Sequence, residues 1–307
     1  MRLEDAAVGR LREIVRAPDL TGTPYRLVGP VGAGGMGAVF DVLDERLSRH
    51  VALKIVDVPL DGEGPAEALL REARVLAGLE HPGLVPVHDA GRLADGRAFY
   101  AMKLVRGDRL DEHLSRVPLL PERLRLFLRV CEPVAFAHAH GILHGDLKPS
   151  NVMVGPFGEV LVLDWGLARA LLPAGMKAKG REGGKGTGTP GFMAPEQASG
   201  AAVDERADVF SLGALLDASL RVAPPSPRSR ALAAIVARAT ATDPDGRYPD
   251  VSRLAADVAR LLDGERVEAY AEGLGGRVVR LLRRHRVAVG LVLAYLAVRG
   301  LFIFFRR

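Results

Sequence analysis

The chain has 307 residues, enough for one two-lobed domain or for two small domains with a core that is stable by itself. Its single cysteine, Cys131, excludes a disulfide framework and fits a reducing compartment. The net charge of +5 is uneven, because residues 277–307 hold eight arginines and no acidic residue, whereas residues 1–276 hold 34 basic and 37 acidic residues. A basic excess confined to a tail argues against a nucleic-acid partner and favours a membrane surface.

The first 24 residues are expected to form an N-terminal extension. Residues 1–15, MRLEDAAVGRLREIV, have an amphipathic helical pattern with acidic residues in the first turn, unlike the uninterrupted apolar stretch of a signal peptide. Residues 17–24, APDLTGTP, are typical of a linker. We therefore expect the folded domain to begin at Tyr25.

Beyond Tyr25 the sequence pattern changes from extended to helical. Val-rich strand patterns joined by turns come first, followed by a helix with Pro65 near its start and by two more strands. After residue 105 the pattern is mostly helical, with two strand-sized pieces. The expected strands are at 25–31, 38–44, 50–58, 84–90, 97–105, 152–154 and 160–163, and the expected first helix of the domain is at 65–80. This order predicts an α+β fold with a β-rich N-lobe, a helical C-lobe and a cleft between them.

An apolar run of 19 residues, 287–305, lies near the end of the sequence. As a helix with a rise of ~1.5 Å per residue it would be about 28 Å long, close to the thickness of a bilayer core. Arg299 opposes insertion by about 2.5–3.5 kcal/mol, but the twelve Leu, Ile, Val and Phe residues together favour it by roughly 4–7 kcal/mol. We therefore predict a C-terminal transmembrane helix at 287–305, in which Arg299 snorkels toward the terminal arginines.

The basic segment before this run indicates its orientation. Residues 265–286 form a juxtamembrane segment that ends in RLLRRHR, so the positive-inside rule places the folded domain in the cytoplasm. The expected location is the cell membrane, with a single pass. Only Arg306 and Arg307 follow the run, so we expect no extracellular sensor.

The stretch GAGGMGAVF contains a G-x-G-x-x-G motif at Gly32, Gly34 and Gly37. Glycines let backbone N–H groups approach phosphates without side-chain obstruction. A dinucleotide-binding fold needs a helix directly after this motif, whereas here the strand-like run AVFDVLD follows. We therefore expect a hairpin that covers phosphates; a glycine-rich turn without a ligand is the simpler alternative.

A lysine lies within the apolar strand pattern VALK, as Lys54. Such a lysine is either an edge-strand residue or a buried cation with an assigned anion. Helical spacing puts Glu72 on the apolar side of the next helix, so we expect a buried Lys54–Glu72 ion pair. Glu67 is the fallback partner, and an exposed Glu72 beside Arg71 or Arg74 is the alternative.

The strongest signal is HGDLKPSN followed by LDWG. These two stretches supply two carboxylates, an ammonium and an amide, as Asp146, Asp164, Lys148 and Asn151. Phosphoryl transfer needs a carboxylate near the attacking hydroxyl, oxygen ligands for Mg²⁺ and a cation on the transferring charge. Downstream of the glycine motif and Lys54, this set predicts phosphoryl transfer.

In this order the motifs make the chain similar to the eukaryotic-type serine/threonine protein kinases of the bacterial, membrane-anchored kind. The resemblance covers residues 25–264, with an N-lobe at 25–104 and a C-lobe at 105–264. It implies an ATP:protein phosphotransferase that uses Mg²⁺ or Mn²⁺ and phosphorylates Ser or Thr of protein substrates, itself included, in signalling. Lys148 and GTPGFMAPE favour Ser or Thr over Tyr as the acceptor.

The resemblance also implies a role for each residue that matches a family motif. Around the reacting groups, Asp146 would be the catalytic base and Lys148 would neutralise the γ-phosphate. Lys54, paired with Glu72, would contact the α- and β-phosphates, and Asn151 and Asp164 would be the metal ligands. Around ATP the roles are the phosphate cover, Gly32, Gly34 and Gly37; the adenine roof, Val39 and Ala52; its floor, Met153; the gatekeeper, Met102; and the hinge, Lys103 and Val105. Structural roles fall to Glu196 paired with Arg247, to Asp208 bracing the catalytic loop, and to Thr189 shaping the pocket after the phosphoacceptor.

The sequence departs from the family pattern in three places. Gly145 replaces the Arg of H-R-D, which in the family binds a phosphorylated activation loop, so we expect an enzyme that is not gated in that way (a non-RD kinase). Trp165 replaces the Phe of D-F-G and is expected to remain an apolar plug. Residues 221–230, RVAPPSPRSR, leave little room for the usual substrate-docking helix.

Two further features carry less chemistry. His138, His140 and His144 resemble a metal cluster but lack an accompanying cysteine or carboxylate ligand, so we interpret them as structural. Residues 177–190 are basic and glycine-rich, which is typical of a mobile activation loop. Thr187 is the candidate phosphosite in that loop.

Two other functions compete with catalysis by a protein kinase. A pseudokinase scaffold would bind nucleotide or partners without turnover, but the chain retains every residue whose loss is typical of such scaffolds. A small-molecule kinase of the aminoglycoside type fits poorly with the A-P-E segment. The sequence does not name the protein substrate or the activating signal, and it leaves association into a dimer open.

Overall fold

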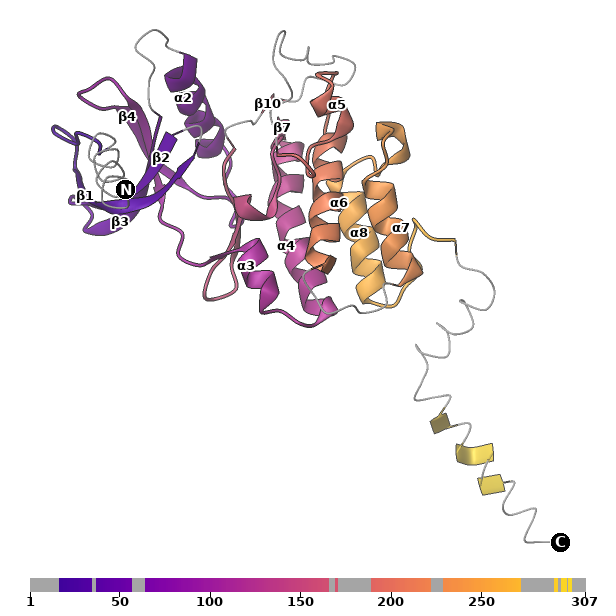
Figure 1. The fold of residues 1–307 in the computed structure, drawn as a ribbon. Helices are drawn as coiled ribbons and strands as arrows, with labels where there is room; N and C mark the ends of the chain where they lie inside the picture. Colours follow the sequence, from indigo (N-terminus) through magenta and orange to yellow (C-terminus); the bar gives the residue numbers. More distant parts are fainter. Residues whose placement is uncertain are drawn as a thin grey trace, which may run out of the picture.

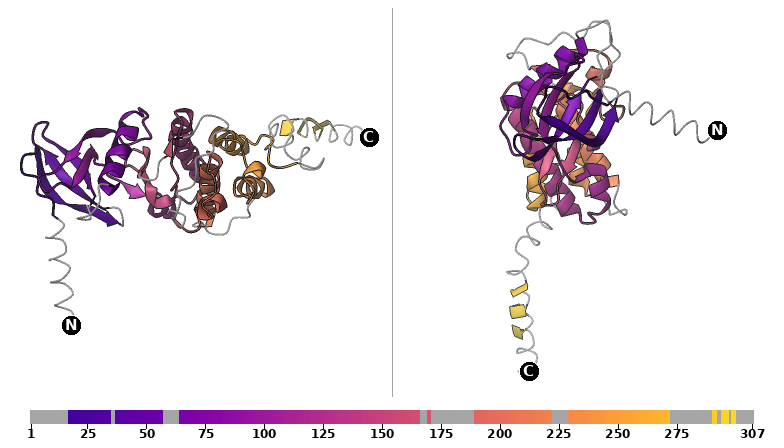
Figure 2. Two further views of the ribbon diagram at one scale, coloured as in Figure 1. Left: turned by 90° about the horizontal axis from the view of Figure 1, so that it is seen from above. Right: turned by 90° about the vertical axis from the view of Figure 1, so that its left-hand side faces the viewer.

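Two lobes, one built on a β-sheet and one on helices, lie side by side in the protein (Figure 1). The computed structural model describes residues 17–34, 37–56, 64–165, 169–170, 189–221 and 229–271, together with 290–291, 294–296 and 298–299. Seen from above, the lobes remain side by side along one axis (Figure 2). The predicted α+β fold with a β-rich N-lobe and a helical C-lobe is confirmed.

The N-lobe is an antiparallel sheet of five strands in the order β1-β2-β3-β5-β4, with one helix packed against it. Its elements are β1 (Tyr25–Gly34), β2 (Gly37–Asp44), β3 (Arg49–Ile55), α2 (Gly64–Ala77), β4 (Val87–Arg92) and β5 (Ala98–Lys103). Side chains alternate between the two faces of each strand, and β2 is buried at every second residue. One face of the sheet therefore forms a core of its own, made by Phe40, Val42, Val51, Leu53, Ile55, Phe99 and Ala101.

The opposite face of the sheet meets α2 and carries the residues of the site. The strand register pairs Val39 with Lys54 and Lys54 with Tyr100, so these three side chains share one row on this face. Ala52 lies opposite Met102 in the neighbouring row. The pleat of β3 thus separates core residues from site residues along a single strand.

The C-lobe is a helical bundle in which α4 packs against α6 and α8. Its helices are α3 (Leu110–Ser115), α4 (Leu120–Ala139), α5 (Pro195–Ala198), α6 (Arg206–Arg221), α7 (Arg230–Ala239) and α8 (Val251–Leu262), with the 3₁₀ turns η1 (Pro149–Asn151) and η2 (Pro244–Gly246). Short strands complete it: β6 (Asp108–Arg109), β7 (Ile142–Leu143), β8 (Val152–Val154), β9 (Val160–Val162) and β10 (Arg169–Ala170). The side chains of Ser229 and Asp250 cap α7 and α8, which fixes where these helices begin.

The predicted strand at 84–90 begins later than expected, because β4 starts at Val87. Leu84 instead forms an isolated parallel bridge with Val162 of the C-lobe, and the Val162 N–H donates to Gly83 O over 2.9 Å. Pro86 lies between these two stretches and has no N–H with which to continue a ladder. Leu84 therefore joins the two lobes rather than extending the sheet.

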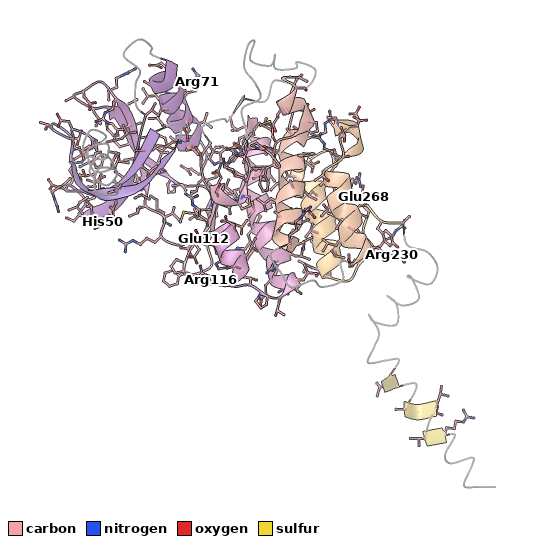
Figure 3. All side chains as sticks on the ribbon, viewed as in Figure 1. His50, Arg71, Glu112, Arg116, Arg230 and Glu268 are labelled. Atoms are coloured by element: carbon pink, nitrogen blue, oxygen red, sulfur yellow. The ribbon has the colours of Figure 1, made fainter. Side chains whose placement is uncertain are left out.

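The first residues of the predicted juxtamembrane segment pack onto the C-lobe. The fully buried carboxylate of Asp257 accepts hydrogen bonds from the backbone N–H groups of Glu268, over 2.6 Å, and Ala269, over 2.9 Å. The Tyr248 hydroxyl donates to the same carboxylate over 2.8 Å, and Val267 is buried beside it. Glu268 lies at the edge of the helical lobe (Figure 3), so the folded part of the chain continues past residue 264.

Several predictions concern segments that lie mostly or wholly outside the described residues: the amphipathic segment 1–15, Thr187 in the activation loop, residues 222–228, and most of the apolar run 287–305. The parts of that run that are described, 290–291, 294–296 and 298–299, are helical. Within the described ranges, no helix has both the length and the apolar character needed to cross a membrane.

Candidate active site

The glycine motif lies in the hairpin between β1 and β2. Gly32 pairs with Val39 and Gly34 pairs with Gly37, so the motif folds back on itself as a lid-like turn. Gly37 has a φ of +131°, and a Cβ there would collide with the carbonyl oxygen of Ile55 on β3. Only glycine fits at that position, whatever lies beneath the hairpin.

The structure brings Lys54 and Glu72 together. Lys54 Nζ lies 2.9 Å from Glu72 Oε1 and 3.1 Å from Oε2, and the Glu72 side chain is 4% exposed. Glu67, the fallback partner, instead pairs with Arg92 at the surface. Arg71, the neighbour of Glu72, is exposed on α2 (Figure 3), so of these two charged residues the helix turns Glu72 toward the sheet.

The same ammonium group also reaches the C-lobe. Lys54 Nζ donates to Asp164 Oδ1 over 2.9 Å, and Asp164 follows β9 with a left-handed φ of +59°. Burial alone would lower the pKa of Lys54, but its contacts with Tyr100, Glu72 and Asp164 outweigh this and raise it. Partial burial would likewise raise the pKa of Asp164, whereas Lys54 holds it below its ordinary value. The ammonium of Lys54 and the carboxylate of Asp164 therefore stay charged at neutral pH.

The residues expected around adenine lie on the sheet face described above and on a strand of the C-lobe. Ala52 is buried, while Val39 and Met102 are half-buried on the same face. Met153 lies in β8, between Arg109 of β6 and Leu161 of β9. Lys103 is the last residue of β5, and its N–H donates to Pro86 O over 3.1 Å. Val105 follows in the connection between the lobes and is half-buried.

Asp146 is the centre of a compact polar cluster. Its Oδ2 accepts from Lys148 Nζ over 2.7 Å, and its Oδ1 accepts from both the N–H and the hydroxyl of Thr189, over 3.1 and 3.0 Å. Lys148 Nζ also donates to the Thr189 hydroxyl over 2.7 Å. Thr189 was expected to shape a neighbouring pocket, and the structure links it directly to the carboxylate and the ammonium.

Asn151 and Asp164 fit the expected metal ligands in their donor chemistry. Asn151 Nδ2 donates to the Asp146 carbonyl oxygen over 2.9 Å, which leaves its Oδ1 without a hydrogen-bond partner among the described residues. Asp164 uses Oδ1 for Lys54, and its Oδ2 has no such partner in the same part of the chain. Two available oxygens, one of them charged, match the way Mg²⁺ is held by few protein ligands together with substrate phosphates.

A buried carboxylate, Asp208 of α6, orders the loop that carries Asp146. Its Oδ2 accepts from the His144 N–H over 2.8 Å and its Oδ1 from the Gly145 N–H over 2.9 Å, and His138 Nε2 lies 2.8 Å from Oδ2. Burial alone would raise the pKa of Asp208, but the hydrogen bond from His138 and its other donors lower it. The carboxylate thus stays ionised and accepts from two consecutive backbone N–H groups.

Gly145 itself is held on both sides. It has a φ of +80°, its N–H bonds Asp208, and its carbonyl accepts from Gln197 Nε2 over 2.9 Å. Gln197 belongs to α5, directly after Glu196, and its Oε1 accepts from the Ala194 N–H over 3.1 Å. A side chain at the left-handed position 145 would cost about 1 kcal/mol in backbone strain.

Trp165 is 1% exposed and lies beneath this loop. Its ring centroid is 4.5 Å from that of His144, and its Nε1–H donates to Val162 O over 3.3 Å. His144 Nε2 lies 3.0 Å from Leu163 O, and its Nδ1 accepts from the Asp146 N–H over 3.2 Å. Trp165 is therefore an internal plug, and the His144 ring has protein partners on both nitrogens.

Glu196 and Arg247 form a bidentate ion pair that fastens α5 to the rest of the C-lobe. The two nitrogens of Arg247 donate to Oε1 and Oε2 of Glu196 over 2.7 and 2.8 Å, and the Arg247 side chain is fully buried. The same guanidinium donates to three carbonyl oxygens, those of Arg206, Ala241 and Thr242. All five N–H groups of the side chain are thereby accounted for.

Three contributors were missed by the sequence interpretation: Tyr100, Gln197 and the pairing of His138 with Asp208. In the sequence, Tyr100 looked like one more apolar residue of a strand. In the structure, its hydroxyl donates to Glu72 Oε1 over 2.9 Å. Gln197 stands beside Glu196 with no pattern of its own. The alternation along β5, which puts Tyr100 on the face of Met102, is the one signal that could have indicated its position.

These elements define a two-lobed phosphotransferase site in which a cation from the sheet meets carboxylates from α2 and from the C-lobe. Residues 25–264 match the family described as "Protein kinase domain". The chain therefore belongs to the protein kinase domain family.

Known relatives agree with this assignment. The chain is 33% identical to the serine/threonine-protein kinase PknD of Chlamydia abortus over 78% of its length, and 34% identical to the serine/threonine-protein kinase PknB of Mycobacterium tuberculosis over 80%. It spans only 31% and 44% of the lengths of these two proteins. Among solved structures, the kinase domain of M. tuberculosis PknI is 28% identical with a TM-score of 0.60, covering 78% of this chain and 96% of that one.

We predict that Arg247→Gln destabilises the C-lobe strongly, because it leaves the largely buried Glu196 without its cation. Breaking a buried pair in this way lowers the free energy of unfolding by about 3–5 kcal/mol. Arg221→Gln is the matched control, since the Arg221 side chain is 73% exposed and its i,i+4 pair with Asp217 is worth about 0.5 kcal/mol or less. Equal losses in the two variants, measured by denaturant unfolding, would contradict the prediction.

Proposed function

We propose that the chain is a serine/threonine protein kinase that transfers the γ-phosphate of ATP to Ser or Thr of protein substrates and of itself. Membership of the protein kinase family implies the use of ATP and a divalent metal ion, for which Mg²⁺ or Mn²⁺ is proposed. The observation that carries the proposal is the ammonium of Lys54 held between Glu72 and Asp164. That contact joins the predicted phosphate-binding lysine to a predicted metal ligand.

In this proposal each polar group has one task. The hairpin with Gly32, Gly34 and Gly37 covers the phosphates, and Lys54 holds the α- and β-phosphates. Asn151 and Asp164 would hold the metal ion through their free oxygens, and the bound ion would supply neutralisation of the phosphate charge.

Asp146 accepts the proton of the substrate hydroxyl as that oxygen attacks the γ-phosphorus. The bond between the γ-phosphorus and the bridging oxygen to the β-phosphorus breaks at the same time, and ADP leaves with that electron pair. Lys148, 2.7 Å from Asp146, is close enough to place its charge on the transferring phosphoryl group. Val39 and Ala52 are proposed to cover adenine from the N-lobe and Met153 from the C-lobe, with Lys103 and Val105 at the hinge. Met102 would close the back of the adenine site.

The competing proposal, a pseudokinase scaffold, needs a defect in this arrangement. Lys54, Glu72, Asp146 and Asp164 are all present, and the first two are paired with the geometry that an active kinase requires. The remaining argument for a scaffold is the short stretch between α6 and α7, which bears on substrate docking rather than on ATP.

Phosphate incorporation tests the proposal directly. With ATP and Mg²⁺ or Mn²⁺, the wild-type chain should phosphorylate itself or a generic protein on Ser or Thr, and Asp146→Asn should lower the rate by about 10²–10⁴-fold through loss of the base. Asp111→Asn, a change of an exposed aspartate on α3 in the same lobe, is the matched control and should keep the rate. If the wild-type chain incorporates no phosphate but ATP still raises its melting temperature, the result supports the scaffold instead.

Regulation without a phosphorylated activation loop is the second part of the proposal. Asp208 and Gln197 hold the Gly145 peptide at its N–H and its carbonyl, so the loop is ordered without an arginine at this position. Thr187→Ala should therefore retain the incorporation rate of the wild type, measured on the same protein acceptor. Loss of activity in Thr187→Ala, restored by Thr187→Glu, would show that a charged activation loop is needed after all.

Anchoring in the cell membrane by residues 287–305, with the kinase domain in the cytoplasm, is proposed as well. Leu291, Tyr295, Leu296 and Val298 support it, because these large apolar side chains are more than half exposed in the described part of the run.

Membrane fractionation tests the anchor. Leu293→Arg with Leu296→Arg adds about 5–7 kcal/mol to the cost of insertion, enough to offset the apolar contribution, and should move the chain to the soluble fraction. The control Leu281→Arg with Leu282→Arg, just before the run, should stay with the membrane. A wild-type chain that is released by an alkaline carbonate wash would contradict the anchor.

A further inference from the structure

A buried hydroxyl at the site has no task in the proposed chemistry. Tyr100 of β5 is 1% exposed, and its hydroxyl lies 2.9 Å from Glu72 Oε1. The same carboxylate oxygen accepts from Lys54 Nζ over 2.9 Å. Glu72 Oε1 is therefore oriented by two donors that come from neighbouring strands of the sheet.

Tyr100 also contacts the other member of the ion pair. The register of β3 and β5 places it directly opposite Lys54, and Lys54 Nζ lies 5.6 Å from the centroid of its ring. Burial raises the pKa of Tyr100, and although Lys54 lowers it, Glu72 raises it further, so the hydroxyl keeps its proton and acts as the donor. One side chain thus touches both the cation and the anion.

The hydrogen bond to Glu72 links the sheet to α2. Ala66, Leu69, Ala73 and Leu76 pack the inner side of α2 into the same core as Tyr100, with no other polar residue of α2 buried there. If α2 moved away from the sheet, the Tyr100 hydroxyl and the Glu72 carboxylate would each lose a partner inside this core. A buried polar group left unpaired shifts such an equilibrium by roughly 5- to 150-fold.

We propose that Tyr100 is a positioning residue, which holds the Glu72 carboxylate in the orientation that receives Lys54 and so keeps α2 docked on the sheet. The expected effect of Tyr100 on ATP binding rests on the proposed function, whereas its effect on the position of α2 can be measured without turnover. Without the hydroxyl, a smaller fraction of the protein has Lys54 in place for phosphates. The apparent affinity for ATP falls by that fraction, while the chemistry of the assembled enzyme is unchanged.

The matched pair of variants is Tyr100→Phe and Tyr248→Phe, made in the full chain. Both remove one hydroxyl from a side chain that is at most 1% exposed and donates to a carboxylate, Glu72 in one case and Asp257 in the other. Tyr248 lies in the C-lobe rather than in the sheet of the N-lobe, where its hydroxyl donates to Asp257 and its ring packs against Arg238. The control variant Tyr248→Phe therefore shows how much stability is lost when any buried tyrosine hydroxyl is removed.

Amide hydrogen exchange of α2 decides the proposal, and steady-state kinetics with ATP gives its consequence. In Tyr100→Phe, exchange over residues 64–77 should be faster by roughly 5- to 150-fold, and KM for ATP should rise with kcat at saturating ATP retained. Tyr248→Phe should leave both the exchange of α2 and KM for ATP unchanged, even where its melting temperature falls.

Unchanged α2 exchange in Tyr100→Phe overturns the proposal, and so does an equal change of α2 exchange in both variants. A wild-type chain without activity would refute the proposed function alone, because α2 exchange in the two variants still supports or overturns the role of Tyr100. With an active wild type, a fall in kcat at an unchanged KM for ATP would also overturn it, since that result indicates loss of folded enzyme rather than loss of positioning.

Discussion

The arrangement of the site depends on one cation, the ammonium of Lys54. An ammonium that is largely removed from water needs anionic partners, and here the two partners come from different parts of the fold, Glu72 from α2 and Asp164 from the C-lobe. When all three meet, the sheet, the helix and the loop after β9 are fixed relative to one another. The position of α2 and the orientation of Asp164 therefore follow from the same contact.

A second buried charge, Asp208, has the corresponding task within the C-lobe. It holds the N–H groups of His144 and Gly145, and Gln197 holds the carbonyl of Gly145 from the other side. The loop that presents Asp146 is thus ordered by groups internal to the C-lobe. This arrangement gives a physical reason why a glycine at position 145 is compatible with an assembled site.

Much of this site could be predicted from the sequence, and the limits of that prediction have physical causes. Glu72 was recognised because helical spacing put a charge on an apolar side, and a buried charge needs a partner. The start of β4 was misplaced by three residues, because Leu84 and Val85 are as apolar as strand residues but lie before the strand, and Leu84 pairs with the other lobe instead. Tyr100 was overlooked, because a tyrosine in a strand pattern does not reveal what its hydroxyl will meet.

The sequence by itself determined which residues are chemically able to act: the lysine, the carboxylates, the amide and the glycines, together with the order of lobes that carries them. Only the tertiary structure decided which of these groups contact one another. The register of β3 against β5 sets Tyr100 opposite Lys54, and the packing of α2 brings Glu72 to both. Register and helix packing are fixed by contacts between residues distant in the chain, which no local pattern contains.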